Sequence, residues 1–517
     1  MSQRPVVYAD GRTLSAQEVA MVAKGQADVA VSDDAWPGIH AARQVVERIV
    51  STGDTVYGIN TGFGALVRER ISTDDLAQLQ INLIRSHATG VGDLMTVEAV
   101  RAMMMVRLNS LCKGHSGIHP DCIRQLVLYL NHNVHPAVPR IGSLGASGDL
   151  APLSHLARTL IGEGEVLVDG KVESTADFLF SNGLVPVELT AKDGLSLING
   201  TSQMTAYAVL AQQELASVLL LADVILAMSM DARSCSLTPS RPEVHDARPH
   251  PGQQRVAERL RTLLSGSEIL QDHASCDRVQ DPYSFRCAPQ VHGAVYESFQ
   301  RLGDVLAREI NSATDNPLIF PEPNRPGEHE VVSQGNFHGE IVALTCDAMS
   351  LAMFELGSIS ERRMDQMLDP ARSEMPAFLA KDSGLESGLM IVQYVAGAAL
   401  AELHGQATPR SAFSTTTSAG QEDHVSMGAN GALQMWRVLE HAEQVLGIEA
   451  MCAAQASDLR GDDYAMAPAL RELQDAFRQH VPFLERDAVM APLMASAAAW
   501  IRGGAPREKA DLRDAQS

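Results

Sequence analysis

Long helical segments are the feature of this 517-residue sequence that most constrains its fold. Through several stretches of more than about twenty residues, apolar side chains recur three and four positions apart, which places them on one face of an α-helix. Aromatic residues make up only 4% of the chain, and this shortage favours helices over sheets. Because long helices bury their apolar faces against one another, the sequence predicts a helical bundle. The longest predicted helices cover residues 202–230, 290–311, 339–368 and 429–457.

Shorter helices and one hairpin complete the predicted secondary structure. Strand-like alternation occurs in one stretch, where Val166 to Val172 predicts a small β-hairpin. Residues 232–256 carry many Pro, Arg and His residues and are expected to form a loop. We expect an N-terminal domain of residues 1–200, followed by residues 201–517 with the central long-helix bundle and a C-terminal helical region. Further helices are predicted at residues 14–24, 40–50, 74–90, 256–265 and 388–405, with two more inside 96–131.

The charge and the cysteine pattern restrict the expected partners and compartment. The formal net charge is −22, and an acidic surface repels nucleic acid and anionic membranes, so neither is an expected partner. Asp223 interrupts the apolar run from Val218 to Leu226, which therefore predicts a buried helix rather than a membrane span. The seven cysteines include no C-x-x-C pair, and the N-terminus has no apolar signal segment. We therefore expect reduced thiols and a cytoplasmic location.

A glycine-rich loop, Gly142 to Leu150, separates two predicted helical regions and has unusual chemical potential. Its three glycines disfavour both helix and strand. In the order Ala146-Ser147-Gly148, the glycine amide nitrogen can close a ring on the alanine carbonyl. Loss of water from that ring and from the serine would leave a methylidene group, an electrophile that no standard side chain supplies. A simple turn is the alternative. The glycine spacing matches neither a dinucleotide-binding nor a phosphate loop, and Ser147 is not in a G-x-S-x-G elbow.

The wider string GSLGASGDLAPLSHL, residues 142–156, resembles the signature of the aromatic amino acid ammonia-lyases and aminomutases. In that family the Ala-Ser-Gly unit forms the prosthetic group 4-methylideneimidazol-5-one (MIO), which the resemblance assigns here to Ala146, Ser147 and Gly148. Further signature blocks extend the resemblance over residues 54–458. It implies an all-α fold of the fumarase/aspartase type with a long central helical bundle. It also implies a homotetramer whose sites combine residues of different subunits, and elimination of ammonia from an amino acid.

Two further loops supply candidate catalytic residues. Tyr57 begins a glycine-rich loop that extends to Gly64. A surface turn is one interpretation of this loop, and a lid that delivers a phenol to a site is another. The loop resembles the family's catalytic-tyrosine loop, which implies that Tyr57 is the general base. Asn199 precedes the predicted helix at 202–230 and suits an N-cap or a turn. The resemblance implies that Asn199 contacts the electrophile and the substrate.

The segment from Gln280 to Arg286 carries candidate substrate-binding residues. Arginine is often an ordinary surface charge, but its guanidinium can also bind a carboxylate through two hydrogen bonds. The string QDPYSFR resembles the family's carboxylate-binding segment. The resemblance implies that Arg286 binds the substrate carboxylate, that Tyr283 makes a supporting hydrogen bond near the prosthetic group, and that Gln280 lines the same site. Phe337, in the string GNFHGE, would by the same resemblance pack against the prosthetic group.

Substrate selectivity is expected to depend on Ser86, His87, Glu422 and Met390. Ser86-His87 occupies the family's selectivity position and resembles the pair of the histidine-specific branch. Glu422 carries a carboxylate that can bind an imidazole N–H, and in the family Gln421 and Glu422 face the active site. Met390 also matches the histidine branch. These residues predict elimination of ammonia from L-histidine to give trans-urocanate.

Other positions depart from the histidine branch and leave alternatives open. Glu386, Leu389 and Phe413 stand where that branch usually has other residues, and His292 is atypical. Alternatives are a tyrosine or phenylalanine ammonia-lyase, an MIO-dependent aminomutase, and a lyase acting on a histidine derivative. A relative with a structural or binding role is a further class, against which the intact Ala-Ser-Gly unit argues.

No metal site is expected from the sequence. His132 and His135 are three residues apart, but two asparagines and a proline surround them. The chain contains neither the H-E-x-x-H pattern of helical zinc sites nor a cysteine and histidine cluster with ligand spacing.

Overall fold

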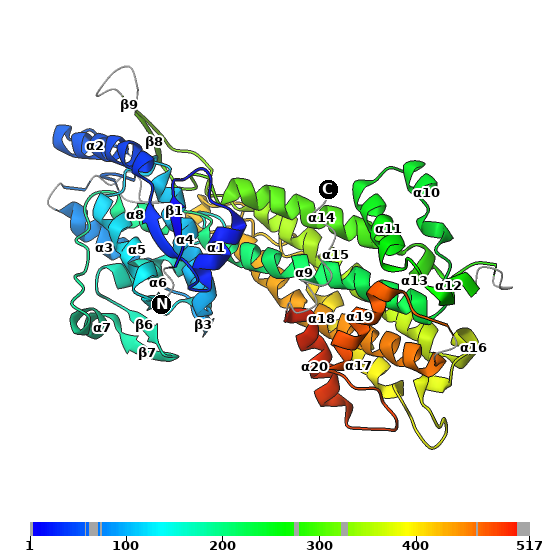
Figure 1. The fold of residues 1–517 in the computed structure, drawn as a ribbon. Coiled ribbons are helices and arrows are strands. Elements are labelled where there is room, and N and C mark those ends of the chain that lie inside the picture. The colour runs from blue at the N-terminus through cyan, green and yellow to red at the C-terminus, as the bar shows by residue number, and fades with distance from the viewer. Residues whose placement is uncertain are drawn as a thin grey trace. The chain divides into compact units, whose positions relative to one another are not determined.

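The computed structural model describes residues 4–56, 58–61, 71–72, 75–272, 279–321, 329–461 and 464–503. Helices dominate this part of the chain (Figure 1), which confirms the predicted all-α class. The chain divides into two compact units. The first contains residues 1–213, 303–347 and 409–436, and the second contains residues 214–302, 348–408 and 437–517. The domain boundary at residue 200 stays a prediction. The first compact unit extends to residue 213 and also includes residues 303–347 and 409–436.

Four long helices correspond to the predicted bundle helices and contain residues of both units. They are α9 (Ser202–Ala232), α14 (Ala288–Glu309), α15 (Glu340–Leu368) and α18 (Gly428–Arg460). Helices α9 and α15 are long and apolar enough to cross a membrane, but 83% and 61% of their most apolar windows are buried inside the protein. Both are therefore core helices, as the charge of Asp223 within α9 predicts.

The shorter helices begin at recognisable sequence signals. Ser15 and Glu18 form a capping box at the start of α1. The Thr96 side chain accepts a hydrogen bond from the Ala99 amide at the start of α4, and Pro120 occupies the first turn of α5. The shorter α-helices are α1 (Ala16–Ala23), α2 (Trp36–Thr52), α3 (Leu76–His87), α4 (Val97–Cys112), α5 (Pro120–Asn131), α6 (Leu150–Leu160), α7 (Thr175–Ser181), α8 (Asp193–Ile198), α10 (Pro242–Asp246), α11 (Pro251–Leu263), α12 (Glu268–Asp272), α13 (Tyr283–Arg286), α16 (Pro370–Ser373), α17 (Met390–Gln406), α19 (Pro468–Arg478) and α20 (Met490–Arg502).

The loop predicted for residues 232–256 is wrong in part. Helix α10 lies within it, and α11 begins five residues earlier than expected, at Pro251 instead of residue 256. Both helices start with a proline, which needs no hydrogen bond for its nitrogen at a helix N-terminus. The prolines that suggested a loop are therefore helix starts.

The predicted hairpin is confirmed, but the sequence missed other strands. β6 (Glu165–Val168) pairs antiparallel with β7 (Lys171–Ser174), and Asp169 and Gly170 both have positive φ in the turn, as a tight hairpin requires. The missed strands have two to four residues each, too few to show an alternating pattern. They are β1 (Val6–Ala9) paired parallel with β2 (Asp28–Val31), β3 (Val91–Leu94) with β5 (Pro139–Ile141), β4 (His135–Pro136) with β6, and β8 (Leu318–Pro321) with β9 (His329–Val332).

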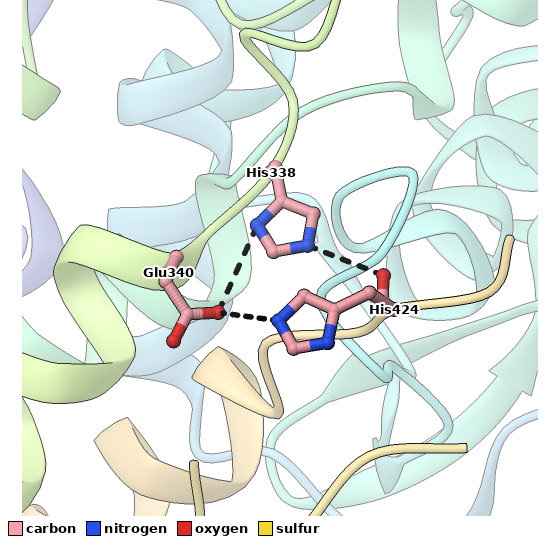
Figure 2. Close-up of side chains that lie close together, drawn as sticks. All are labelled: His338, Glu340 and His424. Atoms are coloured by element: carbon pink, nitrogen blue, oxygen red, sulfur yellow. Dashed lines mark hydrogen bonds and ion pairs between the residues drawn. The ribbon is translucent and has the colours of Figure 1, made fainter. Parts of the chain in front are cut away.

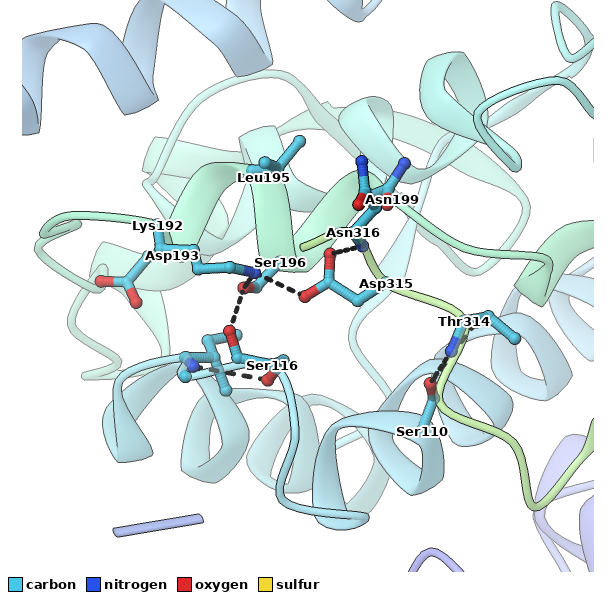
Figure 3. Close-up of polar contacts among 12 residues, drawn as sticks. Ser110, Ser116, Lys192, Asp193, Leu195, Ser196, Asn199, Thr314, Asp315 and Asn316 are labelled. Atoms are coloured by element: carbon cyan, nitrogen blue, oxygen red, sulfur yellow. Dashed lines mark hydrogen bonds and ion pairs between the residues drawn. The ribbon is translucent and has the colours of Figure 1, made fainter. Parts of the chain in front are cut away.

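Buried charges hold α8 and the turn that follows it. Lys192 precedes α8, and its ammonium donates to Asp315 Oδ2 over 2.8 Å and to Ser196 Oγ over 3.2 Å (Figure 3). The guanidinium of Arg107, from α4, donates to the backbone carbonyls of Ser196 and, over 2.7 Å, Asn199. Burial lowers the pKa of Arg107 to about 10, so the side chain stays charged at neutral pH. These bonds satisfy carbonyls at the end of α8 and fix the position of Asn199.

Candidate active site

The glycine-rich loop has a conformation that only glycine permits at two positions. Gly145 and Gly148 have φ values of +67° and +73°. A Cβ atom on Gly148 would lie 2.4 Å from the Gly200 carbonyl oxygen, and one on Gly145 would lie 2.3 Å from Ser426 Oγ. Because both contacts are far inside van der Waals distance, the loop excludes side chains at these positions. Gly148 instead forms a backbone bridge with Gly200, beside Asn199.

Asp149 ties the end of this loop to the start of α9. Its buried carboxylate accepts hydrogen bonds from Ser143 Oγ over 2.7 Å, from the Gln203 amide over 2.7 Å and from the Met204 amide over 3.0 Å. The two amides belong to the first turn of α9, where backbone N–H groups lack partners within the helix. Burial raises the pKa of Asp149 to about 6, although these three donors oppose the shift.

Ser147 lies at the meeting point of two other predicted site residues. Asn199 Nδ2 donates to the Ser147 carbonyl oxygen over 2.7 Å, and Ser147 Oγ donates to Glu422 Oε1 over 2.7 Å. Asn199 Oδ1 is buried and has no hydrogen-bond partner among the described residues. Since an unsatisfied buried acceptor is costly, this oxygen is a strong candidate for a contact with a bound group.

Glu422 is held in place by its own segment. Thr417 Oγ1 donates to Glu422 Oε2 over 2.8 Å, and the backbones of the two residues pair in both directions, over 2.9 and 3.3 Å. One carboxylate oxygen is thus occupied by Thr417, and the other faces Ser147. Gln421 adjoins it and is exposed.

His87 ends α3 and has an electrostatic contact with the same carboxylate. Its Nδ1 lies 2.8 Å from the Leu83 carbonyl oxygen, and because a carbonyl only accepts, Nδ1 carries the proton and leaves Nε2 available. Burial lowers the pKa of His87, while the Leu83 carbonyl and the charge of Glu422 act in the opposite direction. His87 is therefore predominantly neutral at pH 7.

The segment of Phe337 contacts the loop through its backbone. The Gly339 amide donates to the Gly145 carbonyl oxygen over 3.3 Å, and Ser426 Oγ donates to the same oxygen over 2.9 Å. The Met427 amide donates to the Leu144 carbonyl oxygen over 2.8 Å. Phe337, two residues before Gly339, is half-buried.

Four predicted site residues belong to the second unit and are described within it. The Arg286 guanidinium lies 4.4 Å from the centre of the Tyr283 ring, and its Nε donates to the Asp281 carbonyl oxygen over 3.0 Å. Tyr283 is 70% exposed and Gln280 is exposed as well, so these polar groups are available to a ligand. Met390 is the first residue of α17 and is half-buried.

Tyr57, the predicted general base, lies outside the described residues. The sequence analysis also missed supporting residues, above all Arg107 and Asp149. A signal for Arg107 exists in the string MMMVRLNS, where an arginine directly follows four apolar residues of a predicted helix. Such an arginine must be paired or hydrogen-bonded if it is buried. Asp149 stands inside the signature itself, but its contact with α9 is not visible in the sequence.

His132 and His135, the histidines considered for a metal site, are not part of the potential ligand group found among the described residues. His132 is exposed at the end of α5. His135 lies in β4, and burial lowers its pKa to about 4. The structure instead brings together His338, Glu340 and His424, a combination that the sequence analysis did not recognise.

Comparisons with known proteins identify the family of this chain. The family model described as aromatic amino acid lyase matches residues 14–479. A histidine ammonia-lyase of Myxococcus xanthus is 45% identical over 486 residues, which cover 94% of each chain. The crystal structure of histidine ammonia-lyase from Trypanosoma cruzi has a TM-score of 0.89 and 40% identity, covering 98% of this chain and 95% of that one. Tyrosine aminomutase from Streptomyces globisporus has a TM-score of 0.91 and 36% identity, with 98% of both chains covered. This chain belongs to the aromatic amino acid lyase family.

Proposed function

We propose that this protein is a carbon–nitrogen lyase that eliminates ammonia from L-histidine to give trans-urocanate. The observation that carries the proposal is the convergence of Ser147, Glu422 and His87. The Glu422 carboxylate beside the reactive serine is an acceptor, and so is the unprotonated Nε2 of His87, which interacts electrostatically with Glu422. Two acceptors suit a substrate imidazole that donates its N–H groups. The names of the Myxococcus xanthus and Trypanosoma cruzi relatives support the same substrate.

The residues around Ser147 fit the MIO group that the family implies. Gly148 has a positive φ and no room for a side chain, as a backbone ring at this place requires. Asn199 donates to the Ser147 carbonyl oxygen, while its buried Oδ1 is left for another donor. Formed from Ala146, Ser147 and Gly148, this group supplies an electrophile that activates the amino acid substrate.

The chain's own side chains then bind the substrate and move its proton. Glu422 accepts the imidazole N–H, and Arg286 binds the carboxylate with its two-pronged guanidinium. Tyr57 removes a proton from the β-carbon, a weakly acidic position that needs both a fixed base and activation. Phe337, Met390, Gln280, Gln421 and Tyr283 complete the proposed site. A homotetramer in the cytoplasm, with sites shared between subunits, remains part of this proposal.

Ultraviolet absorbance tests the proposal directly. The purified protein is incubated separately with L-histidine, L-tyrosine and L-phenylalanine, since each elimination gives a conjugated acrylate with its own band. Growth of the urocanate band with histidine alone is the expected result. Growth of a coumarate or cinnamate band in its place would overturn the substrate assignment. Formation of β-amino acid without any acrylate would identify an aminomutase.

A further inference from the structure

Three side chains that the proposed reaction does not use converge in the first unit. Glu340 is the first residue of α15, and His338 lies in the loop two residues before it (Figure 2). His424 follows Glu422 by two residues. Glu340 Oε2 lies 3.9 Å from His338 Nδ1 and 3.7 Å from His424 Nε2. One potential ligand atom from each residue lies within 4.8 Å of the other two. The two imidazole rings are stacked, with centres 5.7 Å apart.

The remaining ring nitrogen of each histidine faces another polar group, and for His338 that group identifies the protonated nitrogen. His338 Nε2 lies 3.3 Å from the His424 carbonyl oxygen, which only accepts, so Nε2 carries the proton and Nδ1 of the neutral ring turns its lone pair toward Glu340. His424 Nδ1 lies 3.4 Å from Ser414 Oγ, which leaves Nε2 facing the same carboxylate. Metal-binding histidines typically use their second nitrogen in this way, for a hydrogen bond that orients the ring.

The carboxylate oxygen at the centre of this group lacks a donor. Glu340 Oε2 is buried and has no hydrogen-bond partner among the described residues. A carboxylate oxygen without a donor in the described part of the chain and one nitrogen of each imidazole ring therefore face one another. A cation between them would satisfy the carboxylate oxygen.

We propose that His338, Glu340 and His424 bind a divalent transition-metal ion, for which Zn²⁺ is the best match. Two imidazole nitrogens and a carboxylate are typical zinc ligands, with a fourth position left for water. Ligands about 2.1 Å from a tetrahedral ion lie about 3.4 Å from each other. The separations from Glu340 Oε2 are 3.7 and 3.9 Å, and the two ring nitrogens lie within 4.8 Å of each other. Metal binding therefore needs the rings to move closer, and the His424 side chain is 67% exposed and has room to turn. This proposal differs from the expectation, drawn from the sequence, that the chain has no metal site.

The ion would join two segments that both contact the glycine-rich loop. The Gly339 amide, between His338 and Glu340, donates to the Gly145 carbonyl oxygen, and Ser426 Oγ donates to that same oxygen. A metal bridge between His338 and His424 therefore stabilises the surroundings of the loop without contacting the substrate. This inference does not depend on the proposed lyase reaction, because binding is measured without substrate.

Metal content and metal affinity of the full-length protein test the site. Protein treated with a chelator and then dialysed is titrated with Zn²⁺ by calorimetry, and with Co²⁺ by its visible absorption bands. We expect one equivalent per chain, bands of a tetrahedral Co²⁺ ion, and a melting temperature that rises with Zn²⁺. The variants His424→Gln and Glu340→Gln should each bind Zn²⁺ at least about 100-fold more weakly, since even the loss of a residue that orients a ligand costs 10- to 100-fold.

Two control variants separate this site from other zinc ligands. His480→Gln removes an exposed histidine elsewhere, and Cys287→Ser removes a thiol that is only half-buried. Both controls should keep the full affinity and stoichiometry. The proposal is overturned if the parent protein takes up no stoichiometric Zn²⁺, or if His424→Gln and Glu340→Gln, folded by circular dichroism, bind it as tightly as the parent. His424 is the more exposed of the two residues and its replacement is the safer for folding.

Discussion

The buried polar group around Glu449 and the candidate site around Ser147 both contain a glutamate and a serine. They differ in how many of their polar atoms have hydrogen-bond partners. In the second unit, Arg363 and Glu449 form an ion pair whose side chains are both 0% exposed. Each oxygen of Glu449 accepts from the arginine and from a serine: Ser229 donates to Oε1 over 2.7 Å and Ser360 to Oε2 over 2.6 Å. In the first unit, Asn199 Oδ1 is buried without a partner among the described residues.

The difference separates a structural cluster from a candidate binding site. A carboxylate with four donors has no capacity left for a ligand, so the Arg363–Glu449 pair stabilises only the packing of α15 and α18. Around Ser147, Asn199 Oδ1 has no donor among the described residues, and Ser147 and Glu422 are half-buried. These groups can therefore still bind a ligand. Unsatisfied polar atoms beside reactive groups are thus more informative about function than charged residues as such.

The largest expected effect is the loss of activity in Ser147→Ala. This variant cannot form the methylidene group, so we expect turnover to fall by on the order of 10³-fold or more, as for other residues that carry the chemistry. The melting temperature should change little, because Ser147 is only half-buried. Steady-state kinetics and calorimetry measure both. Ser51→Ala, an exposed serine on α2, serves as the control, and a fully active Ser147→Ala would remove the prosthetic group from the mechanism.

Substitution in the buried ion pair of Arg363 and Glu449 should lower the stability of the fold. Arg363→Met leaves the Glu449 carboxylate buried without its counter-charge, and we expect unfolding to become easier by about 3–5 kcal/mol. The double variant with Glu449→Met should recover part of that loss. Chemical denaturation measures both changes. Lys381→Met breaks an exposed ion pair with Glu485 and should change the free energy of unfolding little. An equally small change in Arg363→Met would show that the Arg363–Glu449 pair does not stabilise the fold.

Asp149 should give the protein a measurable pH dependence of stability. Its folded-state pKa, about 6, is above the ordinary value of 3.8, so the folded state holds the proton more tightly than the unfolded state. The stability from this group is complete below about pH 4 and is lost as the pH rises through 6.

Asp149→Asn removes this titration and keeps an oxygen for the two amides of α9. Between about pH 4 and pH 7, its free energy of unfolding should therefore improve relative to the parent by on the order of 1–3 kcal/mol. Denaturation at several pH values measures the difference. A constant difference across this range would show that Asp149 does not titrate as described.

The smallest expected effect concerns selectivity. His87→Leu removes the imidazole beside Glu422, and we expect kcat/KM for histidine to fall by about 10- to 100-fold while tyrosine or phenylalanine becomes a better substrate. Comparison of kcat/KM for the three amino acids measures the change. Gln78→Leu, on the exposed side of α3, is the matched control. An unchanged order of substrates would exclude His87 as a selectivity residue.

Local sequence patterns were sufficient for the long helices and for much of the candidate site. The helix predicted at 202–230 is α9, and the hairpin after Val166 is present, because helix periodicity and turn residues act within a few positions of the chain. The short strand from Val6 to Ala9 was not predictable, since it exists only through pairing with residues 28–31. The helix at Pro251 was missed because proline marks loops and helix starts alike.

The residue types at the reactive loop, Ala146-Ser147-Gly148 with Asn199 and Glu422, follow from the sequence and its resemblance to a family. Their contacts do not. Glu422 receives a hydrogen bond from a serine 275 positions earlier, and His338 meets His424 across 86 positions. Contacts of this range depend on how whole helices pack, since conformational preferences of single residues extend over only a few neighbours. The sequence therefore determined the chemistry that the loop can carry out. The tertiary structure alone decided that the Asp149 carboxylate has three hydrogen-bond donors, whereas Asn199 Oδ1 and Glu340 Oε2 have none among the described residues.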